Sequence, residues 1–377
     1  MTTNISKLKT PVFVYSKQII KQNYTTIKNS FHYKHLDIHY AIMGNHNVNI
    51  LKYIKQLGIG AQIQSIEELN LVKRLGFNKK YISFTSSGES KSLLKRLIKE
   101  EIILNLESIE ALIDFGIISN KLNSSRKVGI RIYLENISHS KNTINSSEDS
   151  NIGISLNQIS KVHEICKRYN IKIIGIHGYI GSNITSFVPF KQLANILYDV
   201  ALRFPDIEYI NFGSGFGVSS EYNPNKLDFK KVSTYYSKII TKISLKLNKD
   251  IRLKIEPCRY LLSNAGIFFT KVTRVKQINN IKQVYVDSGF GEFARPYIYG
   301  YNTNGYHEII NYSNLNSKKK ELVNIRANTV LQTDIFGKDR LINTVNEGNI
   351  LGLLNTGCYS MSSGFPNLRP KARHILV

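Results

Sequence analysis

Two short motifs in the chain combine residues suited to holding an anion. Gly213-Ser214-Gly215-Phe216-Gly217 is a glycine-rich turn, and its backbone N–H groups can approach an anion closely because three residues lack side chains. Glu256-Pro257-Cys258-Arg259 supplies a carboxylate and a guanidinium three residues apart. Taken singly, the first motif also fits a plain tight turn and the second a buried ion pair. Their chemistry therefore depends on whether the fold brings them together.

Apolar runs and helical patterns alternate between about residues 16 and 256, and this arrangement must position the two motifs. A helix is predicted over Lys17–Phe31, where Ile20, Tyr24, Ile27 and Phe31 recur at helical spacing. Short apolar runs separated by such patterns are typical of buried parallel strands. Eight are predicted, at Leu36–Met43, Ile59–Ile63, Tyr81–Thr85, Ile102–Leu106, Val128–Tyr133, Ile171–His177, Ile207–Phe212 and Ile251–Ile255.

Eight strands with intervening helices predict an α/β fold, a (β/α)8 TIM-like barrel. Beyond residue 265 strand-like stretches follow one another with little helix between them, which predicts a C-terminal all-β domain. The predicted boundaries are residues 29–263 for the barrel, and residues 1–28 with 264–377 for the β domain. Residues Leu134–Asn151 are rich in Ser and Asn and predict a long exposed loop. The predicted strands of the second domain are Phe268–Val275, Gln283–Asp287, Val323–Val330, Leu341–Val345 and Ile350–Leu354.

Chemistry in such a barrel gathers where the strands end. The glycine turn follows the seventh predicted strand and Glu256-Pro257-Cys258-Arg259 follows the eighth, so the barrel predicts that the two anion motifs are neighbours. That position is the usual phosphate site of the fold. The predicted strand ends are crowded with polar residues, apart from the first: Met43, Gln64, Glu107, Arg131, His177, Tyr179, Gly213 and Glu256.

Composition excludes several classes of protein. The net charge is +24, but lysine, asparagine and isoleucine are abundant throughout, so we interpret it as compositional bias and do not expect nucleic acid as a partner. An apolar content of 42% excludes a disordered chain, and no run approaches the roughly 18–20 residues that span a bilayer. The first residues show no signal-peptide pattern, so we expect a cytoplasmic protein. Cys166, Cys258 and Cys358 indicate neither a disulfide framework nor a metal site.

Several ordered motifs together resemble the fold-type III pyridoxal 5′-phosphate (PLP) decarboxylases, the group of diaminopimelate and ornithine decarboxylases, which is related in fold to alanine racemase. The resemblance runs through nearly the whole chain. It rests on seven stretches that match the family's patterns: Thr10–Tyr15, Tyr40–Asn45, Ser65–Leu69, His177–Ser182, Val286–Gly289, Arg295–Tyr299 and Gly357–Tyr359.

The resemblance implies a site for PLP and an amino-acid substrate. Glu256 would pair with the pyridine nitrogen and keep it protonated, which makes the ring an electron sink. Arg295, Tyr299 and Asp339 would face the substrate. The family's sites are built across a two-fold dimer, which implies that Thr333–Asp339 and Tyr359 lie near a partner's barrel mouth. The phosphate would be held by Ser182, Gly213, Ser214, Gly215, Phe216, Gly217, Arg259 and Tyr359.

The departures from the family lie at its catalytic positions. Met43 stands where the family has the lysine that bonds to the cofactor, and a thioether can neither form that bond nor transfer a proton at neutral pH. Tyr179 replaces a histidine that stacks on the ring, and a phenol of pKa about 10 is a different acid. Ile335 stands at the position of the family's cysteine. Phe336 stands at the position of an acidic residue that recognises a distal amine. Cys258 replaces a glycine.

These departures leave several interpretations open. The first is a diaminopimelate decarboxylase-like enzyme whose activity is impaired or absent because of Met43. The second is a non-catalytic homologue that binds PLP, an adduct of it, or a protein partner. The third is an active decarboxylase in which the lysine was replaced by engineering. Lys91 is the nearest substitute amine by motif, and we expect it to cap a helix or face solvent. Gly300 after Tyr299 favours a diaminopimelate-type substrate over an ornithine-type one.

Overall fold

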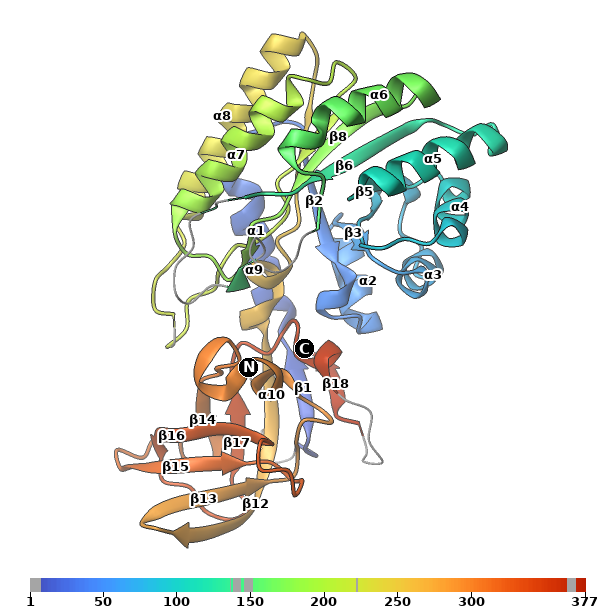
Figure 1. Cartoon of the computed structure of the whole chain (residues 1–377). Coiled ribbons are helices and arrows are strands. Elements are labelled where there is room, and N and C mark those ends of the chain that lie inside the picture. The colour runs from blue at the N-terminus through green and yellow to red at the C-terminus, as the bar shows by residue number, and fades with distance from the viewer. Residues whose placement is uncertain (1–7, 136, 138–143, 146–151, 222, 365–370) are drawn as a thin grey trace.

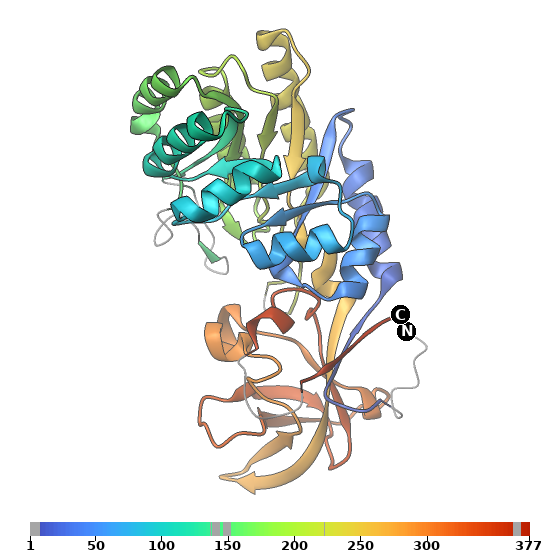
Figure 2. The same ribbon diagram turned by 90° about the vertical axis from the view of Figure 1, so that its right-hand side faces the viewer.

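The computed structural model describes residues 8–135, 137, 144–145, 152–221, 223–364 and 371–377. The chain forms a barrel of strands and helices with a second, mostly β domain at one end of it, as two perpendicular views show (Figures 1 and 2). Within the described residues, no helix combines the length and the apolar character that crossing a bilayer requires.

The barrel consists of eight parallel strands that close in the order β10-β11-β2-β3-β4-β5-β6-β8. Every strand lies within two residues of a predicted run at either end, so the (β/α)8 prediction is confirmed. Met43 lies just outside, because β2 ends at Ala41 and Ile42–Gly44 forms a short 3-10 turn. The strands are β2 (Leu36–Ala41), β3 (Gly60–Ile63), β4 (Ile82–Phe84), β5 (Ile103–Leu106), β6 (Lys127–Ile132), β8 (Lys172–Gly178), β10 (Tyr209–Asn211) and β11 (Arg252–Ile255).

Amphipathic helices cover the outside of the barrel (Figure 1). The predicted first helix spans Lys17–Ser30; the side chain of Ser16 caps its start, and Ile20 and Ile27 are buried on its inner face. Serine side chains cap α3, α4, α5 and α7 in the same way, each accepting a backbone N–H of the first turn. The helices are α1 (Lys17–Ser30), α2 (Val48–Gln56), α3 (Ile66–Arg74), α4 (Lys91–Glu100), α5 (Ile109–Leu122), α6 (Ile159–Tyr169), α7 (Phe187–Ala201), α8 (Phe229–Leu247) and α9 (Cys258–Leu262).

The second domain is built on one sheet with the central order β14-β17-β12-β13-β15-β16, and β1 joins it by pairing with both β12 and β18. A short helix, α10 (Arg295–Tyr299), interrupts it, so the domain is mostly rather than entirely β. Its strands are β1 (Val12–Tyr15), β12 (Gly266–Ile278), β13 (Ile281–Val286), β14 (Ile309–Asn311), β15 (Lys320–Arg326), β16 (Ile335–Asn343), β17 (Ile350–Leu353) and β18 (Arg373–Leu376). The predicted boundaries of the two domains stay a prediction.

Two of the predicted strands of this domain differ most from the structure, and β14 and β18 were not predicted. The strand predicted at Leu341–Val345 begins earlier, at Ile335, because Ile335, Phe336 and Gly337 are buried and pair with β15 across an irregular register. The strand predicted at Val323–Val330 ends at Arg326. Most of the loop predicted at Leu134–Asn151 lies outside the described residues; Ile144–Asn145 forms β7 and pairs with β9 (Gly181–Ser182).

The interior of the barrel is polar and hydrogen-bonded. The Tyr209 ring fills space that glycines leave open, because a Cβ added to Gly175 would lie 1.9 Å from that ring. The Tyr209 hydroxyl donates to Asn105 Oδ1 at 2.6 Å, and the Asn105 amide donates to Thr85. His39 shares a 2.9 Å hydrogen bond with Ser83. The site is therefore supported from below by paired polar groups rather than by apolar layers.

Buried histidines make stability depend on pH. Burial and the nearby charge of Lys254 lower the pKa of His39 to about 3, so the folded chain keeps this ring neutral where the unfolded chain takes up a proton. A depressed pKa contributes stability above the unfolded value, about 6.5, and loses it as the pH falls towards 3.

The free energy of unfolding should fall between pH 6 and pH 4. We predict that His39→Gln makes the slope of this fall smaller by about 1.4 kcal/mol per pH unit. The free energy of unfolding, measured with urea at several pH values, tests this. His163→Gln, at an exposed ring, is the matched control and should leave the slope as it is. Identical slopes in the His39 variant and the original chain would contradict the assignment.

Candidate active site

A cavity of about 630 Å³ lies at the carboxyl ends of the barrel strands, and residues of the C-terminal domain also line it. Its lining includes nine of the residues predicted from the sequence: Met43, Tyr179, Ser182, Ser214, Glu256, Arg259, Arg295, Tyr299 and Tyr359. Six predicted residues do not line it: Gly213, Gly215, Phe216, Gly217, Ile335 and Asp339. Since the nine come from both domains, the cavity exists only when the two are assembled.

Most of the glycine turn lies behind the cavity wall and does not line the cavity. Gly213 and Gly215 have φ of 60° and 107°, and a Cβ on Gly213 would lie 2.5 Å from the Gly178 carbonyl oxygen. Phe216 is fully buried and stacks on Phe190, so its side chain anchors the turn in the core. Ser214 is the residue of the turn that faces the cavity.

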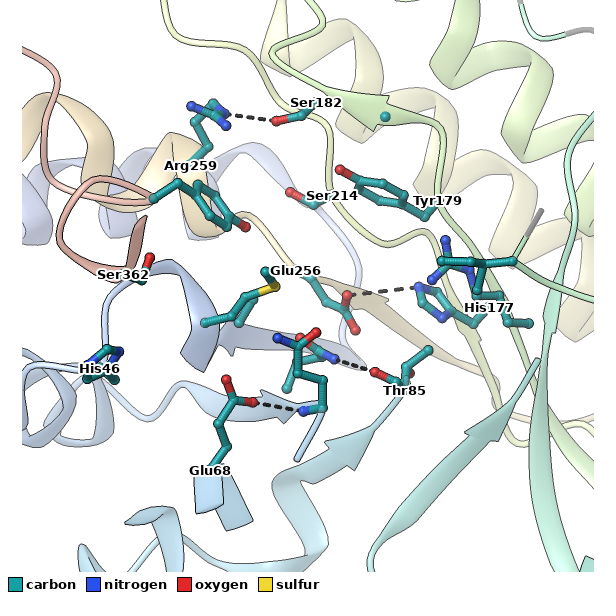
Figure 3. A pocket seen from close by; sticks show the side chains of 18 of the residues that line it. His46, Glu68, Thr85, His177, Tyr179, Ser182, Ser214, Glu256, Arg259 and Ser362 are labelled. Carbon is teal, nitrogen blue, oxygen red and sulfur yellow. Dashed lines mark hydrogen bonds and ion pairs between the residues drawn. The ribbon is translucent and has the colours of Figure 1, made fainter. Parts of the chain in front are cut away.

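A cationic corner lies beside this turn, as Figure 3 shows for Arg259 and Ser182. Arg259 Nε donates to Ser182 Oγ at 2.9 Å, and its guanidinium lies 5.0 Å from the centre of the Tyr359 ring. Ser182 also hydrogen-bonds the Tyr179 phenol. Burial raises the pKa of Tyr179 although the charges of Arg259 and Arg131 oppose the rise, so this phenol stays protonated. The corner offers a guanidinium and hydroxyls to an anion.

A buried carboxylate lies at the floor of the cavity. Glu256 Oε1 accepts a 2.7 Å hydrogen bond from Asn211, whose own Oδ1 accepts from the Gly213 N–H at 2.9 Å. Burial raises the pKa of Glu256, while the Asn211 hydrogen bond and the charge of Arg131 act against the rise. His177 lies 3.9 Å from Glu256 (Figure 3), but burial holds its pKa well below the usual value, so the contact is not an ion pair.

Arg131 presents a buried donor to the same part of the cavity. Within the described residues, the buried Nε atom of Arg131 has no hydrogen-bond partner, although its guanidinium lies 5.5 Å from the centre of the Tyr179 ring. An unpaired buried donor is costly, so this one indicates a ligand that brings an acceptor.

Another wall of the cavity comes from α10. The Arg295 guanidinium lies 4.8 Å from the centre of the Tyr299 ring and donates to the Asn304 carbonyl at 3.1 Å. Burial, followed by the charge of Arg259, lowers the pKa of Arg295 to about 10, which leaves the group cationic at neutral pH. This wall can therefore receive a carboxylate.

Among the described residues that line the cavity there is no lysine. Met43, at the position of the family's lysine, is 40% exposed. Lys91, the substitute considered from the sequence, starts α4, is exposed and forms a 3.2 Å ion pair with Asp114. Covalent capture of an aldehyde by a lysine needs the amine within bonding reach, and this site does not provide one.

The structure adds residues that the sequence predictions left out. Gln62 lines the cavity from β3, and Thr85 lines it just after β4. Glu68 also lines it and accepts a 2.8 Å hydrogen bond from the Gln64 backbone N–H. Alternation along the strand could have found Gln62, which precedes the predicted Gln64 by two residues. His46 lies in a loop and Ser362 in the short 3-10 helix Met361–Ser363, and no sequence pattern marked them.

Comparison with known proteins defines the class. Residues 17–263 match the family model "Pyridoxal-dependent decarboxylase, pyridoxal binding domain", and the chain belongs to this family. A diaminopimelate decarboxylase of Aquifex aeolicus is 29% identical, over 98% of this chain and 86% of that protein. The crystal structure of diaminopimelate decarboxylase from "m. jannaschi" has a TM-score of 0.87 at 26% identity, covering 98% of this chain and 87% of that one. The fold-type III resemblance is thereby confirmed, and with it PLP as the family's cofactor.

The described residues fit PLP except at one point. The corner at Arg259, Ser182 and Ser214 suits a phosphate, and the buried Glu256 suits a protonated ring nitrogen. The unpaired Arg131 Nε supplies a donor in between. Met43 cannot hold the aldehyde carbon covalently. The site therefore fits a cofactor that is held by non-covalent contacts alone.

We predict that Arg259→Met weakens PLP binding by roughly 10- to 100-fold, because a hydrogen bond to a charged group contributes about 1.5–3 kcal/mol. A titration followed by PLP absorbance measures the affinity. Arg203→Met removes an exposed charge elsewhere on the barrel and should leave the affinity unchanged. Equal affinities of the two variants would show that Arg259 does not hold the phosphate.

Proposed function

We propose that this protein holds PLP and an amino acid in a decarboxylase site that lacks its covalent anchor, so that turnover is impaired or absent. One observation carries the proposal: the cationic corner at Arg259, Ser182 and Ser214 is retained, although Met43 stands at the position of the family's lysine. Among the retained groups, Glu256 is buried and bound by Asn211, and half-buried Arg259 donates to Ser182. The buried Arg131 Nε atom has no partner among the described residues, and such a donor is expensive to keep without a ligand.

The proposed substrate class follows from the wall of the cavity that α10 forms. Arg295 is buried and cationic, which suits the carboxylate of an amino acid. The relatives compared above are diaminopimelate decarboxylases, and Gly300 follows Tyr299 as in that group. We therefore propose a diaminopimelate-like amino acid or a modified amino acid as the bound substrate.

Each group of the chain has a defined task in this proposal. Bound PLP supplies an electron sink for the bond between Cα and the leaving carboxylate. Glu256 keeps a proton on the ring nitrogen, and Asn211 fixes its carboxylate. Arg259, Ser182 and Ser214 hold the phosphate. Tyr179, whose ring lies beside the Arg131 guanidinium, would take the place of the family's stacking histidine.

A non-catalytic role is the second candidate, and the changes at Tyr179 and Ile335 favour it. A single replacement at position 43, natural or engineered, would leave the other catalytic positions as the family has them. Here Tyr179 replaces the stacking histidine and buried Ile335 occupies the cysteine position. A protein with all three changes would bind PLP, an adduct of it or a protein partner without turning over.

Restoring the amine separates the candidates. We predict that Met43→Lys with PLP produces a new near-visible absorbance band, because the amine would extend from the exposed turn after β2 into the cavity. Borohydride should then leave a pyridoxyl group on Lys at position 43, found by mass analysis. Met43→Leu, which adds no amine, is the control and should show neither signal.

The outcomes of this restoration differ for each candidate. The band together with CO2 release from diaminopimelate means that position 43 alone silenced the site. The band without turnover favours the non-catalytic role. Absence of the band with excess PLP contradicts the proposed cofactor site. A pyridoxyl group on any lysine of the original chain would contradict the reading of Met43 as a true loss.

Assembly is the remaining part of the proposal. We predict a two-fold homodimer, in which the stretch Thr333–Asp339 of one chain lies near the cavity of the other. Ile335 and Phe336 are buried in their own domain, so exposed Thr333, Lys338 and Asp339 are the side chains that could reach a partner. Sedimentation at micromolar concentration should give twice the mass of the chain. A monomer would count against the shared site.

A further inference from the structure

A second cavity, of about 830 Å³, opens at the other end of the barrel. Its lining includes the first residues of several strands, such as Ile103 of β5, Lys127 of β6, Tyr209 of β10 and Arg252 of β11. In a parallel barrel these amino ends lie opposite the ends that carry Glu256 and Arg259. The cavity is therefore separate from the candidate active site.

Lys254 lies in this cavity without an ion-pair partner among the described residues. Its side chain lines the cavity, although the residue as a whole is only 3% exposed. The ammonium lies 3.8 Å from the centre of the Tyr209 ring. Within the part of the chain that the structure describes, it makes no hydrogen bond or ion pair. A buried ammonium with three free donors is costly, and an acceptor from outside the chain would remove that cost.

The acidic residues of the cavity are already committed to other partners. Asp37 forms two hydrogen bonds with Arg252, at 2.6 and 2.5 Å. Glu208 pairs with Lys127 at 2.7 Å, and Glu101 pairs with Lys79. Of the lining cations within the described residues, Lys80, Lys99 and Lys254 have no ion-pair partner. The uncompensated charge of the cavity is thus positive, which favours an anion.

The cavity also has an apolar wall. Leu104, Phe115 and Val128 line it and are almost fully buried, and Ile103 lines it beside them. An inorganic anion would leave this wall unused, whereas an organic carboxylate could place its charge at Lys254 and its apolar body against the wall.

We propose that this cavity is a binding site for small organic carboxylates with an apolar body, anchored by Lys254. The carboxylate accepts hydrogen bonds from the ammonium, and the Tyr209 ring holds the lysine side chain from beneath. Tyr209 is itself fixed by its hydrogen bond to Asn105. The proposal does not depend on PLP or on position 43.

Protection of Lys254 from acylation tests the proposal on the unaltered chain. Acetic anhydride is applied in pulses at pH 8 with and without benzoate, and peptide mass analysis gives the acetylation rate of each lysine. We expect saturating benzoate to slow acetylation of Lys254 at least fivefold and to leave exposed Lys52 unaffected. Benzylamine, which has the same ring with the opposite charge, should not protect. Unchanged rates at Lys254 would overturn the proposal.

Two further experiments test the class of ligand and the role of Lys254 as the anchor. Inorganic phosphate should protect Lys254 at least tenfold less well than benzoate at equal concentration; equal protection would overturn the requirement for an apolar body. Lys254→Met keeps the length of the side chain, and calorimetry should show benzoate affinity at least tenfold lower than that of Lys52→Met. Retained affinity in a folded Lys254→Met variant would overturn the role of Lys254 as anchor.

Discussion

The side chain of Asn211 is the constraint on which both halves of the candidate site depend. Its amide nitrogen donates to Glu256 and its oxygen accepts from the Gly213 N–H, so one residue at the end of β10 fixes the buried carboxylate and starts the glycine turn. The Glu256 N–H donates in turn to the Gly213 carbonyl. The buried carboxylate and the glycine turn are therefore coupled through the Asn211 amide and this backbone hydrogen bond, so a shift of one would disturb the other.

This coupling does not involve the residue at position 43. Met43 lies on the turn after β2, while the Asn211 network lies on β10 and β11, so a change at position 43 breaks no hydrogen bond of the network. The turn itself is tightly fitted: a Cβ on Gly44 would lie 2.2 Å from the sulfur of Cys258. The backbone that carries position 43 is held in place by a residue of the Arg259 motif. A non-covalent cofactor site is consistent with such a frame.

The sequence was sufficient for the barrel because each of its strands is a short apolar run between amphipathic helices, a pattern with one favoured solution. It also located most of the cavity, since strand ends in a closed barrel must meet at one mouth. It did not reveal Asn211, because an asparagine before a glycine turn has no distinctive spacing. His46 and Ser362 reach the cavity through the tertiary placement of a loop and of a short 3-10 helix, which no local pattern announces. The early start of β16 at Ile335 was missed because its bulged register breaks the alternation on which strand prediction relies.

The pairing of β1 with β18 has a consequence for how the chain is made. Val12–Tyr15 lies beside Arg373–Leu376 in parallel register, so the first strand has its final neighbour only after almost the whole polypeptide has left the ribosome. Its other neighbour, β12, is also synthesised after the entire barrel. A newly made barrel thus emerges with an apolar leading strand that has no edge to join. Sheltering that segment during translation is a task that falls to the cell rather than to the fold.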